Sequence, residues 1–322
     1  MGFTFRGISV TIRAMSRWRA VVVVAALGAC QAVPTDPGTL LRLPDTERDG
    51  AEGNDGARGA AWVEFTGQAR ITERLLVQVV YPARADGTLD RAGAPYPSVV
   101  FVQGAGVGRE RYHWLALHLA TRGYVVLLPQ HLFALSILDT DNAILSLAAA
   151  REVVTEAGTL HGAIAPTAPA VVMGHDVGGL IAARQWRERT DFLGVALLAA
   201  YPQSGDMLSA RATGSVLAIT GTADTLSPPA RVRDAWLAIG PTRDPLTPRA
   251  FAVVEALNHY AWTDSPEDNE RANDGPRPDD ARGVRANALA VLDAWLDATL
   301  RGSAEGRALL DRNDFRGVTV YR

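Results

Sequence analysis

The sequence predicts an α/β fold in which helices flank a mostly parallel central sheet, and three observations support this. Short apolar runs rich in Val, Ile and Leu alternate along the chain with longer stretches of helical periodicity. Most of these runs are apolar at every position, which is typical of strands buried on both faces of a parallel sheet. The third observation is the length of 322 residues, which a single α/β domain with flanking segments commonly reaches.

The N-terminal segment has the features of a secretory signal. Arg13, Arg17 and Arg19 precede the run AVVVVAALGA, which is too short to span a membrane. The run ends in LGAC, which resembles the lipobox of bacterial lipoproteins, and Cys30 is the only cysteine of the chain. The resemblance implies a signal peptide over residues 1–29 and a lipid on Cys30. We therefore expect an exported protein anchored at a bacterial cell envelope membrane, in the periplasm or at the cell surface.

Composition separates a tether from a folded domain. Residues 30–59 are rich in Pro, Gly, Asp and Glu without apolar periodicity, so we expect a flexible, lipid-anchored tether. Residues 60–322 are long enough to bury one sizeable core. The net charge is −3 and the basic residues are scattered, which disfavours nucleic acid as a partner. Nothing indicates an obligate protein partner, so we expect a small-molecule substrate.

The expected strands appear in two groups. AWVEF and RLLVQVVYP follow one another with no helical stretch between them, which predicts an antiparallel hairpin at one edge of the sheet. Continuous apolar runs then predict the parallel strands. These runs cover residues 98–103, 124–129, 169–174, 192–200, 215–221 and 250–256.

Helical patterns lie between these runs. They cover residues 112–122, 142–157, 177–189, 230–239 and 285–300. In the last of them Leu289, Leu292 and Trp295 recur at helical spacing, and we expect Trp295 to anchor the helix in the core. The polar stretch over residues 263–283 is predicted to be a surface loop.

The stretch MGHDVGG places an aspartate between a strand and a helix. Glycines around such a turn allow the strand and the helix to pack closely. The frame resembles the nucleophile elbow of the α/β-hydrolase superfamily, with Asp176 at its apex and His175 packed behind it. An Asp at a helix start is also an ordinary N-cap, so the turn alone leaves a structural role open.

Two further residues follow in the order that this superfamily uses. Asp224, in GTADTLSPP, occupies the turn that supplies the acid, and His259, in LNHYAWTD, lies where the superfamily has its base. Three such residues at three strand ends favour an active site, functional or ancestral. The resemblance also implies an oxyanion hole made by the backbone N–H groups of Val177 and Ala105.

The loop GAGVG offers a competing interpretation as a dinucleotide-binding loop, because it follows a strand and precedes a helix. However, Arg109 occupies the position of the third glycine, and no acid follows the next strand. The six histidines show no metal-ligand spacing either. We therefore expect neither a cofactor nor a metal.

From Val77 onward the layout resembles the lidless branch that includes dienelactone-hydrolase-like, chlorophyllase-like and polyester-degrading esterases. Lidded relatives insert a cap where this chain has only residues 202–213, so we expect no cap domain and an open site. Polar and aromatic residues near the expected opening are candidates for the substrate pocket. These are Gln103, which replaces a usual histidine, and Tyr112, Trp114, Tyr260 and Trp262.

The elbow sequence GHDVGG, in contrast, resembles that of haloalkane dehalogenases and epoxide hydrolases. In those enzymes an Asp attacks a saturated carbon, and a His then activates water to hydrolyse the resulting ester. The resemblance implies hydrolysis of a carbon–halogen or epoxide bond by Asp176, His259 and Asp224. Val177 replaces the Trp that cradles halide, and without a cap the leaving-oxygen acid would be Tyr112, Tyr260 or His113.

Two alternatives stay open at this point. The chain is also compatible with an esterase homologue in which a Ser-to-Asp change leaves a non-catalytic binding protein or a weak hydrolase. Asp176 is also able to serve as a general base for water.

Overall fold

The computed structural model describes residues 39–40, 59–70, 73–131, 134, 140–154, 158–202, 214–238, 244, 246–264 and 266–322. The expected signal peptide, Cys30 and most of the expected tether lie outside these ranges, so export and lipid attachment stay predictions. The described ranges belong to one unit, Gln31–Arg322. No helix within them has the length and apolar character needed to cross a membrane.

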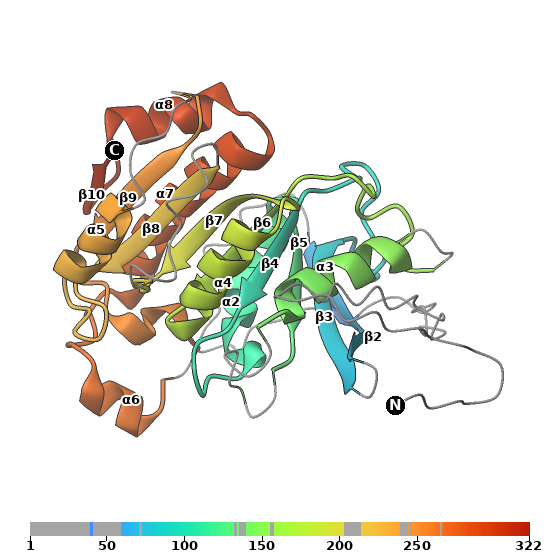
Figure 1. Ribbon diagram of the computed structural model, residues 1–322, viewed down its shortest axis with the longest axis horizontal. Helices are drawn as coiled ribbons and strands as arrows, with labels where there is room; N and C mark the ends of the chain where they lie inside the picture. Colours follow the sequence, from blue (N-terminus) through green and yellow to red (C-terminus); the bar gives the residue numbers. More distant parts are fainter. Residues whose placement is uncertain are drawn as a thin grey trace, which may run out of the picture. The chain divides into compact units, whose positions relative to one another are not determined.

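The described strands form one sheet of ten strands in the order β1-β2-β3-β5-β4-β6-β7-β8-β9-β10 (Figure 1). Pairing is parallel from β5 through β4 and β6 to β9, and antiparallel at both edges. This confirms the α/β class and the edge hairpin. The strands are β1 Thr39–Leu40, β2 Gly59–Arg70, β3 Glu73–Ala83, β4 Ser98–Val102, β5 Val125–Pro129, β6 Ala170–His175, β7 Phe192–Leu198, β8 Ser215–Gly221, β9 Arg249–Val254 and β10 Val318–Tyr321.

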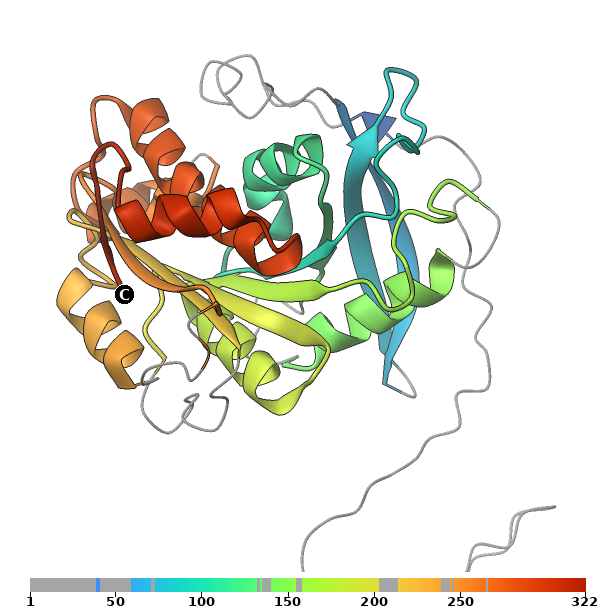
Figure 2. The same ribbon diagram turned by 90° about the horizontal axis from the view of Figure 1, so that it is seen from above.

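Two sets of helices cover the two faces of this sheet (Figure 2). Side chains of α3, α4 and α5 pack into the core on one face, and those of α2, α7 and α8 pack into the core on the other. The helices are α2 His113–Thr121, α3 Asn142–Val153, α4 Val177–Glu188, α5 Pro229–Ala238, α6 Asp268–Asn273, α7 Ala281–Leu300 and α8 Ala304–Arg312.

The central strands are apolar throughout because each of them contributes to both cores. In β4, Val100 and Val102 belong to one core, and Val99 and Phe101 belong to the other, as the two-residue period of a strand requires. Trp295 is fully buried on α7, and its Nε1 donates to the carbonyl of Pro248 at 3.3 Å. Its expected role as a core anchor is therefore confirmed.

Several local expectations need correction. Within the expected tether, Thr39–Leu40 pair with Ala61 and Trp62, so this dipeptide is part of the sheet. The expected surface loop over 263–283 contains α6, which is stabilised by a capping box, and the first turn of α7. The helix α3 ends at Val153 instead of residue 157.

The chain beyond residue 300 adds two elements for which no expectation was made. Helix α8 packs against α7, and β10 pairs antiparallel with β9 at the far edge of the sheet. Between β7 and β8 the chain has too few residues for a separate domain, which agrees with the absence of a cap. Residues 203–213 themselves lie outside the described ranges.

Candidate active site

Asp176 stands in the turn between β6 and α4 with unusual backbone angles, φ 52° and ψ −126°. A residue other than glycine adopts this region only where the surrounding structure imposes it, and such strain is common at active sites. Tight packing imposes it here. A Cβ on Gly174 would collide with the backbone of Gly178, and one on Gly178 would collide with the backbone of Val102. Glycine is therefore required at both positions.

His259 connects the two aspartates that the sequence predicts to lie near it. Its Nδ1 lies 3.2 Å from both carboxylate oxygens of Asp224, and its Nε2 lies 3.7 Å from Oδ1 of Asp176. The structure thus brings together three residues from the ends of three different strands. The imidazole lies between a buried carboxylate on one side and a partly exposed one on the other.

The environment of Asp224 fixes its orientation. This carboxylate is buried, and its Oδ1 accepts the backbone N–H groups of Leu226 at 3.0 Å and Ser227 at 2.6 Å. A carboxylate with these donors holds one position and retains an oxygen for the imidazole. Asp224 therefore orients His259 with Nδ1–H toward the carboxylate and Nε2 toward Asp176.

The pKa of His259 is raised above its ordinary value. Burial of the ring lowers this pKa, but the hydrogen bond to Asp224 and the negative charges of Asp224 and Asp176 outweigh burial. The imidazole is thus a stronger base than a free histidine, and it lies next to the partly exposed carboxylate of Asp176. This combination suits proton abstraction from a water molecule.

Two backbone N–H groups lie near Asp176, one beside its side chain and the other at the start of the following helix. The N–H of Ala105, in the exposed loop after β4, donates to Oδ2 of Asp176 at 3.3 Å. Val177 is the first residue of α4, so its N–H has no partner within the helix. Both expected donors therefore occupy positions compatible with an oxyanion hole.

His175 links three loops behind this site. The carbonyl of His259 can only accept, so Nε2 of His175 donates to it over 3.1 Å, and the pKa of the buried His175 ring is lowered well below its ordinary value. The neutral ring leaves Nδ1 as an acceptor for the hydroxyl of Tyr112 at 3.0 Å. That hydroxyl accepts the N–H of Gly104 at 2.9 Å, next to the Ala105 donor.

Most of the expected pocket residues are buried instead of lining an opening. Gln103 and Tyr112 are buried, and Tyr112 belongs to the network behind His175. Trp114 and Trp262 stack on one another with ring centroids 6.4 Å apart, and Trp114 donates to the carbonyl of Trp262. Of the five expected residues, Tyr260 alone is partly exposed within the described part of the chain.

The residues that hold the His259 loop in place are not among those predicted from the sequence. Arg111 makes a bidentate ion pair with Glu270 at 2.8 and 2.6 Å and donates to the carbonyl of Asp264. The carboxylate of Asp274 accepts the N–H of Tyr260 at 2.9 Å. The only sequence signal for these contacts was the high density of charged residues between 263 and 283.

Metal ligands do not gather at this site. Among the residues that the structure describes, no three His, Cys, Asp or Glu side chains form a group suited to a metal ion. The expectation of no cofactor is based on the sequence argument and stays a prediction.

The fold and the order of these residues along the chain define a protein of the α/β-hydrolase class. The Alpha/beta hydrolase family matches residues 98–261, just over half of the chain, from β4 to the turn that carries His259. The chain therefore belongs to the Alpha/beta hydrolase family, whose members are generally hydrolases. A comparison with curated proteins finds no match.

Proposed function

We propose that this hydrolase cleaves a carbon–halogen or epoxide bond of a small organic molecule through a covalent ester on Asp176. The observation that carries the proposal is the arrangement around that carboxylate. His259 lies 3.7 Å from Oδ1, and the N–H of Ala105 donates to Oδ2. One oxygen is thus held by a backbone donor, while the other lies on the side of the base.

In the first step, a carboxylate oxygen of Asp176 attacks a saturated carbon. The new C–O bond forms as the carbon–halogen bond breaks, and the halide leaves with the electron pair. A carboxylate is ionised at neutral pH, so no base is needed for this step. With an epoxide the ring C–O bond breaks instead, and the leaving oxygen needs a proton.

In the second step, His259 removes a proton from water, and the hydroxide attacks the carbonyl carbon of the Asp176 ester. The negative charge that develops on the ester oxygen is stabilised by the N–H groups of Ala105 and Val177. Collapse of this intermediate releases the alcohol and restores the carboxylate. The net reaction adds one water and releases one equivalent of acid or, for an epoxide, produces a diol.

For an epoxide, Tyr260 is the best available proton donor of the three candidates named from the sequence. Tyr112 is buried and its hydroxyl already bonds to His175 and Gly104, and Nε2 of His113 is bonded to Gln78. The pKa of Tyr260 is raised, first by burial and then by nearby carboxylates that include Asp176. The hydroxyl of Tyr260 thus stays protonated at neutral pH and is available to donate.

Carboxylic ester hydrolysis by the serine-type route is disfavoured for two reasons. Attack of a carboxylate on an ester would form an anhydride and expel an alkoxide, which is a far poorer leaving group than the nucleophile itself. In addition, Oδ2 of Asp176 already takes the N–H of Ala105 that an ester carbonyl would need. The second candidate function is therefore a binding protein that has lost ester hydrolysis.

The test is the intact mass of the His259→Gln variant after incubation with a mixed pool of small haloalkanes and epoxides. This change blocks the water step, so the alkyl ester accumulates and peptide mapping places the added mass on Asp176. The control is the Asp176→Asn/His259→Gln double variant, which gains no mass. If folded His259→Gln protein gains no mass from a broad pool, the alkyl-enzyme mechanism is wrong for these substrates and the binding function is favoured.

A further inference from the structure

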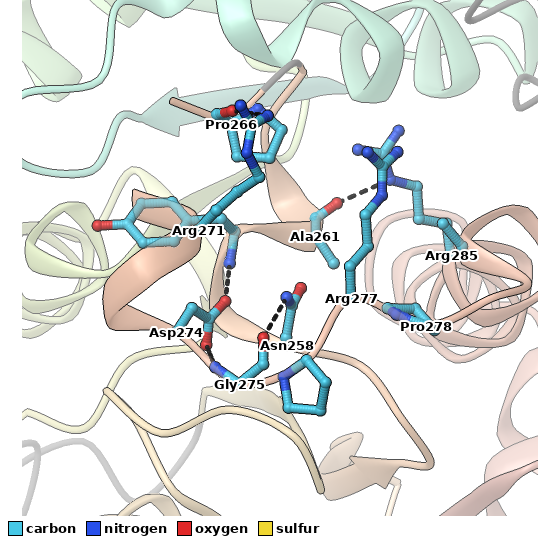
Figure 3. Close-up of a pocket in the computed structure, with 12 residues that line it drawn as sticks. Asn258, Ala261, Pro266, Arg271, Asp274, Gly275, Arg277, Pro278 and Arg285 are labelled. Atoms are coloured by element: carbon cyan, nitrogen blue, oxygen red, sulfur yellow. Dashed lines mark hydrogen bonds between the residues drawn. The ribbon is translucent and has the colours of Figure 1, made fainter. Parts of the chain in front are cut away.

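A pocket lies beside the His259 loop, and of the residues that the proposed mechanism uses only Tyr260 lines it. Its volume is about 250 Å³. The side chains of Arg271 and Arg277 extend toward the upper part of the view in Figure 3, and Asp274 lies below them. The residues that line it are Asn258, Tyr260, Ala261, Pro266, Arg271, Asp274, Gly275, Pro276, Arg277, Pro278, Ala281 and Arg285.

Two of the three lining arginines already have partners. Arg271 pairs with Asp268 and donates to the carbonyl of Pro266 at 2.6 Å. Arg285 donates to the carbonyls of Ala261 at 2.8 Å and Thr263 at 2.7 Å. These arginines contribute positive charge to the pocket, but their positions are set by contacts within the protein.

The acidic side chain of the pocket is also satisfied. Oδ2 of Asp274 accepts the N–H of Tyr260 at 2.9 Å, and Oδ1 accepts the N–H of Gly275 at 2.7 Å. Asp274 therefore has a structural role in the backbone of this segment. The lining thus contains three guanidinium groups and one carboxylate, so its net charge is positive.

Arg277 differs from the other two arginines. Within the described ranges its guanidinium makes no hydrogen bond and no ion pair. Pro276 precedes it and Pro278 follows it, and the residue before a proline is restricted to extended conformations. The backbone that presents this free cation at the pocket is thus constrained before any ligand arrives, which reduces the entropy lost on binding.

We propose that this pocket binds the carboxylate of a small organic acid, with Arg277 as the principal anchor. A guanidinium matches a carboxylate with two parallel N–H···O hydrogen bonds. The volume falls below the roughly 300–1,000 Å³ of pockets for drug-sized ligands, so the occupant is a small molecule or one end of a larger one. Ala261 and the prolines offer apolar surface to the rest of such a ligand.

Tyr260 connects this pocket with the candidate active site. It lines the pocket, and its ring centroid lies 5.1 Å from that of His259. A substrate that carries a carboxylate would place that group in the pocket and its reactive carbon toward Asp176. This last link depends on the proposed function, whereas binding of the carboxylate itself does not.

The test uses isothermal titration calorimetry with benzoate and, as a neutral counterpart, benzamide. We expect the wild-type protein to bind benzoate at least about tenfold more tightly than benzamide. Arg277→Gln should weaken benzoate binding at least about tenfold, as expected for loss of a charge-assisted hydrogen bond. The affinity for benzamide should stay unchanged. Arg282→Gln, which removes the same charge from an exposed residue outside the lining, should change benzoate affinity less than about twofold.

Two outcomes would overturn the proposal. Benzoate and benzamide binding equally would show that the pocket does not recognise the charge, and equal losses from Arg277→Gln and Arg282→Gln would show only a general electrostatic effect. Because Arg277 is exposed and has no partner among the residues that the structure describes, its variant is expected to fold, and circular dichroism checks this. If benzoate binds through Arg277 while folded His259→Gln protein gains no mass from the haloalkane and epoxide pool, this inference stands and the alkyl-enzyme mechanism is wrong for those substrates.

Discussion

At the scale of single residues, the two aspartates around His259 differ in environment although their chemistry is the same. Asp224 is buried and held by two backbone N–H groups, so it cannot approach a substrate. Asp176 has about a third of its side chain exposed and stands on a strained turn that directs it outward. This difference in environment supports the proposed roles, in which Asp224 orients the base and Asp176 attacks the substrate.

The charge of Asp176 leads to a prediction about pH. The pKa of His259 is raised in the free protein by Asp224 and in part by Asp176. In the proposed mechanism, formation of the ester removes the negative charge of Asp176, so the pKa of His259 is expected to fall in the intermediate. In that mechanism His259 must be neutral to activate water, so ester hydrolysis slows as the pH drops through that lower pKa.

Two measurements check this prediction. Single-turnover kinetics give the pH at which ester hydrolysis loses half its rate, and NMR of the imidazole gives the pKa of His259 in the free protein. The kinetic value should be the lower of the two. The Asp176→Asn variant, which has no charge at this position, should show a His259 pKa lowered in the same direction. Equal values in all three cases would contradict the argument.

At the scale of elements, the segment after β9 is held against the start of α2 by one arginine. Arg111 reaches across to Glu270 on α6 and to the backbone of Asp264, and its own carbonyl accepts the N–H of Asp264 at 2.7 Å. Arg285 of α7 adds a contact from the other direction and lies 4.6 Å from the ring of Trp114. These contacts hold the segment over residues 263–285 in place next to the His259 loop.

Removal of this arginine is expected to destabilise the protein. The Arg111 and Glu270 side chains are only 15% and 10% exposed, so Arg111→Met leaves a mostly buried carboxylate without its partner. Such a loss costs about 3 kcal/mol of unfolding free energy. Denaturant unfolding measures it, and the Arg111→Met/Glu270→Gln double variant should recover part of the loss because no charge stays unpaired. A single-variant cost below about 1 kcal/mol would show that the pair contributes little.

At the scale of the whole molecule, the central sheet was predictable from the sequence because each parallel strand is buried on both faces. The runs over 98–103 and 215–221 correspond to β4 and β8 within one residue. The edge strand β10 was not predictable in the same way. In the pattern of Val318–Tyr321 only Val320 is buried, and its partner β9 is more than sixty residues away in the chain.

The candidate site was predictable only in part, for a related reason. Asp176, Asp224 and His259 each follow a strand, so the parallel sheet brings them to one edge. The burial of Trp114 and Trp262 depends on contacts between distant elements, because the two rings stack on one another and Arg285 of α7 lies over Trp114. No local sequence pattern predicts such burial. Arg277 was missed because its lack of a partner among the described residues is a property of the folded chain.

The network around His175 leads to a prediction about acid stability. His175 is fully buried, and its pKa in the folded protein lies well below the ordinary value, first because of burial and then because of His259. In the unfolded chain the same ring takes up a proton near about pH 6.5. Below that pH the unfolded state binds one more proton than the folded state, so the free energy of unfolding decreases as the pH falls.

The contribution of His175 is therefore complete above about pH 6.5 and is lost progressively below it, with a limiting slope of about 1.4 kcal/mol per pH unit for one proton. Urea unfolding of the wild type and of His175→Gln between about pH 5 and 8 measures this slope. The variant has a lower stability throughout because it loses the bonds to Tyr112 and His259, but its dependence on pH should be weaker by about one proton. His161→Gln, at an exposed histidine, should keep the wild-type slope. Parallel profiles for the wild type and His175→Gln would mean that this ring is protonated in the folded protein as well, and the network of Gly104, Tyr112 and His259 would then need a different arrangement of hydrogens.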